Sequence, residues 1–200
     1  SIVVEDLRNE RIQENKLHLV YNGIEVDQFH PRENTEAEQN VTDRVTFVCL
    51  ANLNYYKGHS DLIQALSRVS DELPTAWQML FVGRDDGEGD SLRALCTELN
   101  LLGHIQFLGE RSDVPDILRT ADIGVLASHE EGFSNAVIEC MASGLPMVVC
   151  DVGGNAEAVT VDVGYVVPPS DVPRLSAALL TIARSTDRAK MSKAACERVE

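Results

Sequence analysis

The sequence lacks the features that mark several classes of protein. It contains no apolar run close to the ~20 residues that a membrane span requires, and no signal-peptide pattern. Its 5 cysteines stand singly among apolar neighbours, without the close spacing of a zinc site or a redox pair. We therefore expect buried free thiols in a reducing compartment, and a cytoplasmic protein.

Positive charge is also scarce. The chain has 17 Lys and Arg residues against 32 Asp and Glu residues, a formal net charge of −15. Binding to a nucleic-acid backbone depends on Lys and Arg side chains that neutralise phosphates, so we expect no nucleic-acid partner. A single nucleotide needs only one or two local cations, and a small phosphorylated ligand therefore remains possible.

The glycine motifs of common nucleotide-binding enzymes are absent. No Gly-x-Gly-x-x-Gly follows a first strand, and Gly87-Glu88-Gly89 is a poor substitute because its acid would repel a pyrophosphate. There is no Walker A sequence. The 5 histidines show no metal-ligand spacing, and His129 without a partner is interpreted as structural or exposed. A nicotinamide dehydrogenase is disfavoured, and we expect neither a bound metal nor a cofactor.

Short apolar runs alternate with helical patterns along most of the chain. Six strands are predicted, at 45–50, 77–82, 104–108, 123–126, 147–150 and 164–167. Helices are predicted between and after them, at 60–73, 91–100, 114–120, 135–143, from 155 and from about 171. This rhythm predicts an α/β fold with a doubly wound, Rossmann-like parallel sheet. Ligands of such folds bind at the carboxyl ends of the strands.

The pattern divides the chain into three parts. Residues 44–200 carry the alternation and form the predicted Rossmann-like domain. Residues 32–43 are polar and without periodicity, which is typical of a linker. Residues 1–31 fit the repeat less well and are assigned to the end of a preceding domain. Since the chain starts at Ser1 and stops inside a helical pattern, we interpret it as a piece of a longer protein.

The most unusual segment surrounds two acids. Glu139 is the one carboxylate in an apolar helical pattern between Ser134 and Gly144, and an unpaired buried charge is costly. Glu131 precedes the same helix. The first turn of that helix offers free N–H groups and the positive end of the helix dipole, which together favour an anion.

Cations follow the other predicted strands. Lys57 comes after the first strand, Arg84 after the second and Arg111 after the third, so with Glu131 they are predicted to face one cleft. Carboxylates beside a phosphate site naturally accept hydrogen bonds from hydroxyl groups. The combination predicts a nucleotide sugar as ligand, with Glu139 at the ribose and Glu131 at the transferred sugar.

These segments resemble a known family. His129–Pro146 closely resembles the Glu-x7-Glu signature of the family-4 retaining glycosyltransferases, which have the two-domain GT-B fold. Further segments match that family in order and spacing: Asn22–Phe29, Lys57-Gly58, Phe107–Gly109, Asp151–Glu157 and Gly164–Pro169. The resemblance covers most of the chain and implies the C-terminal, donor-binding half of a GT-B enzyme.

The resemblance implies a role for each matching residue. Glu131 would bind the hydroxyls of the donor sugar and stabilise the transition state, Glu139 would hold the ribose, and Lys57 would neutralise the leaving diphosphate. Arg84 and Arg111 would lie near the base. The loop before the helix would contact sugar and diphosphate, chiefly through backbone amides, at Gly132, Phe133, Ser134 and Asn135.

The sequence departs from the family pattern in two places. Ala51-Asn52-Leu53 stands where the family commonly has Gly-Arg-Leu, so Asn52 can donate a hydrogen bond but brings no charge to the diphosphate. The loop between Val159 and Gly164 is shorter than the family pattern.

The sequence therefore predicts the donor-binding domain of a retaining glycosyltransferase that moves a hexosyl group from a nucleotide-diphosphate sugar to an acceptor hydroxyl. By resemblance, a glycan, lipid or small-molecule acceptor would bind a missing N-terminal domain. The full-length protein could associate peripherally with the inner face of the membrane. The chain alone is expected to bind nucleotide weakly and not to transfer sugar. Three alternatives remain: a glycosidase using both acids, a non-catalytic nucleotide-binding module, and a GT-B nucleotide-sugar epimerase.

Overall fold

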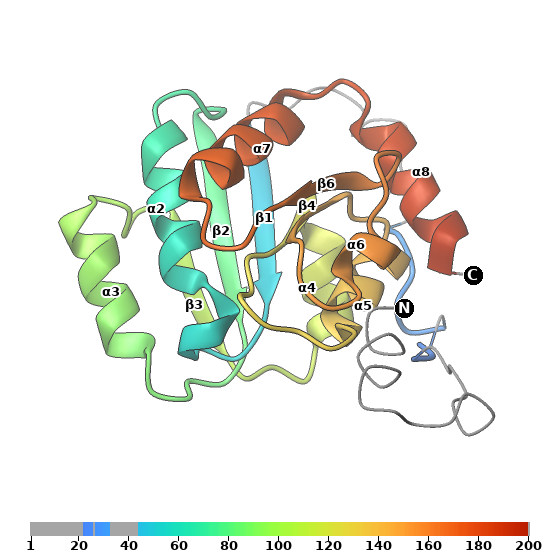
Figure 1. Ribbon diagram of the computed structural model, residues 1–200, viewed down its shortest axis with the longest axis horizontal. Coiled ribbons are helices and arrows are strands. Elements are labelled where there is room, and N and C mark those ends of the chain that lie inside the picture. The colour runs from blue at the N-terminus through green and yellow to red at the C-terminus, as the bar shows by residue number, and fades with distance from the viewer. Residues whose placement is uncertain (1–21, 26, 33–43, 200) are drawn as a thin grey trace, which may run out of the picture.

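The computed structural model describes residues 22–25, 27–32 and 44–199 (Figure 1). Most of the predicted preceding segment, and all but one residue of the predicted linker at 32–43, lie outside these residues. The described part contains a parallel sheet with six strands in the order β3-β2-β1-β4-β5-β6. The strands are β1 Arg44–Leu50, β2 Ala76–Val82, β3 Ile105–Gly109, β4 Ile123–Leu126, β5 Met147–Cys150 and β6 Gly164–Val167. The predicted fold class is confirmed.

Helices follow each strand. They are the 3-10 helix η3 Tyr55–Lys57, then α2 His59–Val69, α3 Gly89–Glu98, α4 Val114–Thr120, α5 Asn135–Ala142, α6 Asn155–Ala158, α7 Val172–Arg184 and α8 Arg188–Val199. Helix α2 ends at Val69, before the predicted residue 73, and residues 70–72 form a turn. The last helical region is two helices, since Ser185 adopts an extended conformation between them.

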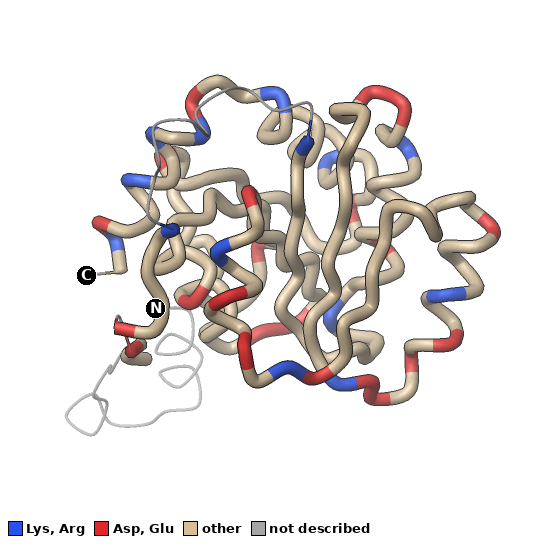
Figure 2. The backbone as a smooth tube through the Cα atoms, turned by 180° about the vertical axis from the view of Figure 1, so that it is seen from behind, with Lys and Arg blue, Asp and Glu red and all other residues tan. Residues whose placement is uncertain are grey.

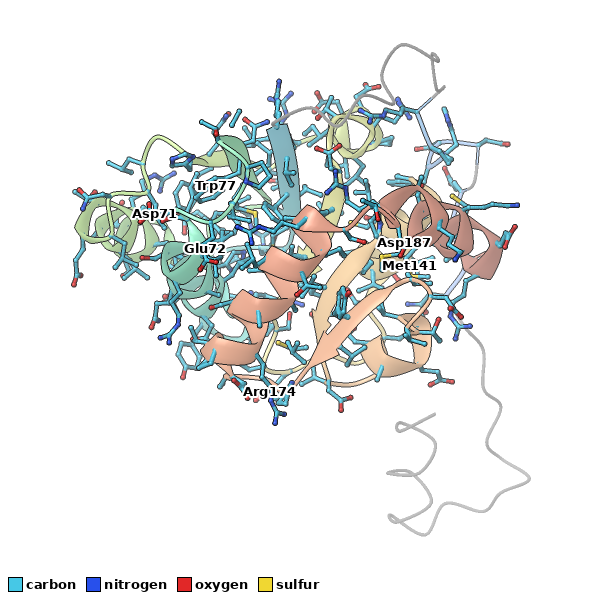
Figure 3. All side chains as sticks on the ribbon, turned by 90° about the horizontal axis from the view of Figure 1, so that it is seen from above. Asp71, Glu72, Trp77, Met141, Arg174 and Asp187 are labelled. Atoms are coloured by element: carbon cyan, nitrogen blue, oxygen red, sulfur yellow. The ribbon has the colours of Figure 1, made fainter. Side chains whose placement is uncertain are left out.

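Both faces of the sheet are buried, as expected for a parallel sheet with crossover helices. Apolar side chains of α2, α3 and α7 pack on one face, and those of α4, α5 and α8 pack on the other. Within β1, Phe47 and Cys49 belong to the first layer while Val48 belongs to the second. Seen from above, α7 lies beside α2 (Figure 3). Arg184, the last residue of α7, donates to the carbonyl of Glu72.

The strand order reverses between β1 and β4. From β1 the chain moves outward through β2 to β3, and it then returns to β4 and continues through β5 to β6 on the other side. Strands β1 and β4 are paired in parallel, with Phe47 opposite Ile123. The connections that leave these two strands diverge, which opens a crevice at their carboxyl ends. The loops of residues 51–58 and 127–134 therefore border the position where such folds bind ligands.

Charges are interspersed on this edge of the sheet. Figure 2 shows Lys and Arg positions alternating with Asp and Glu positions along the loops at the carboxyl ends of the strands. Several are local ion pairs, including Arg84 with Asp86 and Arg111 with Asp113. Within the described ranges, every helix is too short or too polar to traverse a bilayer.

Candidate functional site

Lys57 and Glu131 meet at the crevice between β1 and β4. Lys57 ends η3 after β1, and Glu131 lies in the loop that joins β4 to α5. Their Nζ and Oε1 atoms are 2.6 Å apart, and the two side chains are 19% and 9% exposed. The hydroxyl of Ser128 donates to the same Oε1 atom at 2.7 Å. A cation and an anion far apart in the sequence thus form one partly buried cluster.

The loop that carries Lys57 is fastened to the loop that carries Glu131. Gly58 has a φ of +67°, and a Cβ atom there would lie 2.0 Å from the carbonyl oxygen of Ala127. The backbone N–H of His129 donates to the carbonyl of Tyr56 at 2.7 Å. Only a residue without a side chain permits this close approach, which places Lys57 beside Glu131.

His129 adds a side-chain contact to the same connection. Its Nε2 atom lies 2.8 Å from Oδ2 of Asp61 in α2. Because an ionised carboxylate only accepts hydrogen bonds, Nε2 must carry the proton. The side chain of His129 therefore joins the loop after β4 to the first turn of α2, and its partner Asp61 is too distant in sequence to be inferred from spacing.

Two glycines that follow β5, Gly153 and Gly154, pack against the loop that carries Glu131. Gly153 has a φ of +54°, and a Cβ atom there would lie 2.2 Å from the carbonyl oxygen of Gly132 and 2.3 Å from that of Glu131. The N–H of Gly154 donates to the carbonyl of Gly132 at 2.7 Å. The Gly153-Gly154 pair is thus a contact surface for the Glu131 loop as well as a turn into α6.

Two adjoining cavities lie along these loops. The larger, of about 430 Å³, is lined by Asn22, Leu50, Ala51, Asn52, Asn54, Tyr56, Lys57, Glu131, Phe133, Ser134, Asn135 and Ala136. The smaller, of about 230 Å³, is lined by Gly23, Ile24, Glu25, Phe29, Asn135, Ile138 and Glu139. Asn135, the first residue of α5, lines both, and its side chain accepts a hydrogen bond from Asn22. The larger cavity therefore joins Lys57 to the amide-rich first turn of α5.

Glu139 lies one turn further along α5, in the smaller cavity. Burial raises the pKa of this carboxyl above its usual value. In the part of the chain that the structure describes, no cation pairs with it. A half-buried carboxylate without a counter-ion is suited to accept hydrogen bonds from hydroxyl groups.

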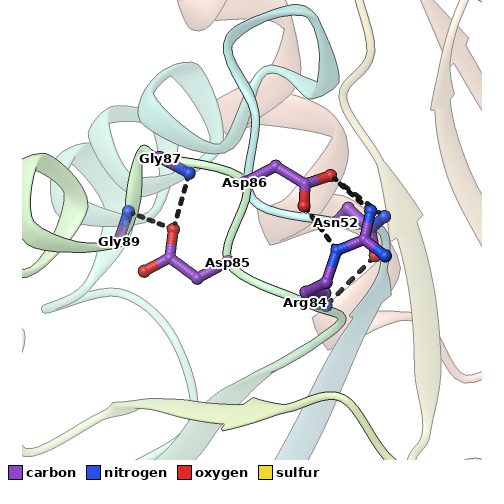
Figure 4. Close-up of polar contacts among 6 residues, drawn as sticks. All are labelled: Asn52, Arg84, Asp85, Asp86, Gly87 and Gly89. Atoms are coloured by element: carbon purple, nitrogen blue, oxygen red, sulfur yellow. Dashed lines mark hydrogen bonds and ion pairs between the residues drawn. The ribbon is translucent and has the colours of Figure 1, made fainter.

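Asn52 is held in a network at the rim of the larger cavity (Figure 4). Its Nδ2 donates to Asp86 at 3.2 Å, and its Oδ1 accepts from the backbone N–H of Arg84 at 3.1 Å. The guanidinium of Arg84 in turn donates to Asp86 at 2.6 Å and lowers the pKa of that carboxyl. Both polar atoms of Asn52 thus already have partners on the loop after β2.

Arg84 and Arg111 share the edge of the sheet with Lys57 but line neither cavity. Arg84 is 59% exposed and paired with Asp86, and Arg111 is paired with Asp113 at 2.6 Å. Both follow strands on the far side of β1 from β4, away from the point where the strand order reverses. Among the other predicted residues, Gly132 lies in the loop without lining a cavity. The larger cavity brings together Asn52, Lys57, Glu131, Phe133, Ser134 and Asn135.

A buried thiol and imidazole lie near Lys57. Cys49 Sγ and His59 Nε2 are 3.8 Å apart. Burial, with the positive charge of Lys57, lowers the pKa of His59 to about 4, and burial raises the pKa of Cys49 to about 12. At neutral pH both groups are uncharged, so Cys49 is no thiolate nucleophile. The described residues also contain no group of three His, Cys, Asp or Glu side chains arranged to hold a metal ion.

Taken together, the fold and the site define an α/β domain with a crevice at its switch point, the position where such folds bind ligands. The profile of the family Glycosyl transferases group 1 matches residues 31–198, and the chain belongs to this family. It is a glycosyltransferase domain. Family 4 within this group remains a prediction from the resemblance.

Known proteins of the family resemble the chain in sequence and in structure. A curated relative from Campylobacter jejuni, N,N'-diacetylbacillosaminyl-diphospho-undecaprenol alpha-1,3-N-acetylgalactosaminyltransferase, is 30% identical over 166 residues, covering 78% of this chain and 42% of the relative. A glycosyltransferase from Rickettsia africae superposes with a TM-score of 0.86 at 23% identity, over 99% of this chain and 56% of that protein. The chain spans less than half the length of the curated relative.

Two further structures are informative about the domain. The C-terminal domain of the group 1 glycosyl transferase LpcC from Francisella tularensis has a TM-score of 0.76 at 23% identity, and the match covers 88% of this chain and 96% of that domain. Anabaena HepE, solved in complex with UDP and glucose, has a TM-score of 0.77 at 24% identity, over 90% of this chain and 51% of that protein. The chain therefore has the fold of the C-terminal half of a GT-B glycosyltransferase.

Proposed function

We propose that this chain is the donor-binding domain of a retaining glycosyltransferase that transfers a hexosyl group from a nucleotide-diphosphate sugar to an acceptor hydroxyl. The observation that carries the proposal is the larger cavity, where Lys57, Glu131 and the first turn of α5 converge at the switch point. The relative from Campylobacter jejuni is named as a sugar transferase, and HepE is solved with UDP and glucose, which supports a nucleotide-sugar donor.

Each group has a distinct part in the proposed binding mode. The N–H groups of α5 and the ammonium of Lys57 bind the diphosphate, because both present positive charge to the same cavity. Glu131 accepts hydrogen bonds from hydroxyls of the donor sugar. Glu139 accepts hydrogen bonds from the ribose in the adjoining cavity.

The proposed reaction is a front-face substitution. The acceptor oxygen bonds to the anomeric carbon on the side from which the diphosphate leaves, and the bond from that carbon to the phosphate oxygen breaks. The departing phosphate takes the proton of the acceptor hydroxyl. Lys57 stabilises the charge that develops on the leaving group, and Glu131 stabilises positive charge on the sugar. We propose that neither a metal nor a cofactor takes part, so that chelation with EDTA leaves transfer unchanged.

The glycosidase alternative is less well supported. A glycosidase places two carboxyl groups on either side of one glycosidic bond. Here Glu131 lines the larger cavity and Glu139 lines the smaller one, and Oε1 of Glu131 is held by Lys57. Release of sugar from an aryl glycoside without nucleotide would nevertheless favour it, and interconversion of nucleotide sugars without an acceptor would favour the epimerase.

Ligand-induced stabilisation tests the proposal directly. The chain would be unfolded thermally with UDP, GDP or ADP and with UDP-glucose, GDP-mannose or ADP-glucose. A ligand at a hundred times its Kd stabilises a protein by ~2.7 kcal/mol. We expect at least one diphosphate and its sugar to raise the unfolding temperature. No shift with any of the six compounds, at millimolar concentration, would contradict the proposal.

The acceptor side belongs to a part of the enzyme that this chain does not include. We propose that residues 44–200 form the donor domain, that residues 1–31 end the N-terminal domain and that residues 32–43 link the two. A glycan, lipid or small-molecule acceptor would bind that N-terminal domain, at the cytoplasmic face of the membrane if it is lipid-linked. Multiple-turnover transfer by the purified 200-residue chain would contradict this division.

A further inference from the structure

The two oxygens of the Glu131 carboxylate have different surroundings. Oε1 accepts hydrogen bonds from both Lys57 and Ser128, at 2.6 and 2.7 Å. No donor from the described residues reaches Oε2. An ionised carboxylate has about four acceptor positions, so Oε2 retains its full capacity for a ligand. One oxygen is thus used by the protein and the other is available.

Ser128 is built into the fold. It lies just after β4 and is 0% exposed, so its hydroxyl has no access to water. A buried hydroxyl needs a protein acceptor, and the acceptor here is Glu131. The neighbouring Ala127 is also buried, and its carbonyl contacts Gly58, which fixes the backbone from which Ser128 extends. The Ser128 hydroxyl therefore has one orientation.

Once a diphosphate is bound, the ammonium of Lys57 no longer interacts with Glu131 alone. A diphosphate carries more negative charge than one carboxylate, and its oxygens compete for the same ammonium. The hydrogen bond from Lys57 to Oε1 then weakens or breaks. The Ser128 hydroxyl is neutral and buried, so it stays with Oε1 when the diphosphate arrives.

We propose that Ser128 is a positioning residue that holds Oε1 of Glu131 and leaves Oε2 for hydroxyls of the donor sugar. The inference rests on the proposed function, because it assigns Glu131 to the sugar. Without Ser128, the carboxylate rotates more freely when Lys57 turns to the diphosphate. The affinity for the sugar part of the ligand falls, while the affinity for the diphosphate part does not.

Titration calorimetry on the 200-residue chain separates the two parts of the ligand. Each protein is titrated with UDP and UDP-glucose, and with GDP and GDP-mannose. We expect Ser128→Ala to weaken binding of the nucleotide sugar roughly tenfold and to leave binding of its diphosphate unchanged within about twofold. Ser176→Ala is the matched control, since Ser176 is also buried but donates to the carbonyl of Val172 within α7. It should change neither affinity.

Two additional variants make the outcome unambiguous. Ser128→Thr retains the hydroxyl and should recover most of the lost sugar affinity, provided that its unfolding temperature is close to that of the wild type. Glu131→Gln should also weaken binding of the nucleotide sugar more than binding of its diphosphate. An equal loss for both ligands in Ser128→Ala, or no loss, overturns the positioning role even if Glu131→Gln behaves as expected. If Glu131→Gln has no selective effect, or no ligand binds the wild type, the proposed function itself fails.

Discussion

At the scale of single residues, stability and binding make opposite demands on Glu139. Its carboxyl is half-buried without a cation among the described residues, and burial raises its pKa. A raised pKa means that the folded state prefers the protonated acid. Its stabilising contribution is therefore complete below the ordinary pKa near 4.5 and is lost as pH rises through the folded-state value.

We expect Glu139→Gln to stabilise the fold and to weaken nucleotide binding. The neutral amide avoids the cost of a buried charge, so the unfolding temperature at pH 7 should rise by ~2 °C, and by less at pH 4. The same change removes the charge-assisted acceptor that we propose for the ribose, and nucleotide affinity should fall roughly tenfold. Thermal unfolding and calorimetry measure the two effects, with the exposed Glu98→Gln as control.

The lowered pKa of His59 leads us to expect a second dependence of stability on pH, opposite in sign to that of Glu139. Its pKa is lowered to about 4 from 6.5, so the unfolded chain binds a proton at a higher pH than the folded protein does. Stability should fall as pH drops from 6.5 towards 4, by about 3 kcal/mol in total. Urea unfolding at pH 7 and pH 5 measures this loss of stability. His59→Gln, which cannot titrate, should reduce the difference between the two pH values, and an unchanged difference would contradict the assignment.

At the scale of elements, the Glu131 loop depends on the glycine turn that follows β5. Gly153→Ala would force a Cβ atom against two carbonyl oxygens of that loop, at a positive φ. We expect a loss of stability of about 1–3 kcal/mol and weaker binding of the nucleotide sugar. Gly103→Ala is the control, because nothing lies within 4 Å of the position of its Cβ. Urea unfolding and calorimetry of both variants test this, and equal effects would contradict it.

The elements themselves could be predicted from the sequence because each depends on a local pattern. All six strands were predicted within a residue or two, since each is a short apolar run between helices. The break between α7 and α8 was not predicted, because Ser185 is neither Gly nor Pro and gives no local stop signal. The four-residue α6 also has no sequence signal for its early end.

The candidate site was predictable in part, for a reason that concerns strand order. Four residues each follow a strand, and this was sufficient to place them on one edge of the sheet: Lys57, Glu131, Arg84 and Arg111. It could not tell which loops border the crevice, because strand order depends on tertiary packing. Because the strand order reverses between β1 and β4, Lys57 and Glu131 line the larger cavity. Both arginines lie outside the two cavities. Ser128 was missed although it stands three residues before Glu131, since serine is common in loops.

At the scale of the whole molecule, the site is assembled from segments that are distant in sequence. The loops after β1, β4 and β5 contact one another through Gly58, His129 and Gly153, so the sheet fixes their relative positions. A ligand that bridges Lys57 and α5 therefore contacts both halves of the doubly wound sheet. We infer that nucleotide binding opposes global unfolding and not only the motion of one loop.

The buried thiol of Cys49 has a practical consequence. Because it is 0% exposed and has a pKa of about 12, an alkylating reagent can modify it only when the protein opens around the end of β1. Its rate of modification, measured by mass spectrometry, therefore reports how often this region opens. A ligand in the adjacent crevice should lower the rate at which Cys49 is modified, which would make this cysteine a reporter for ligand screening.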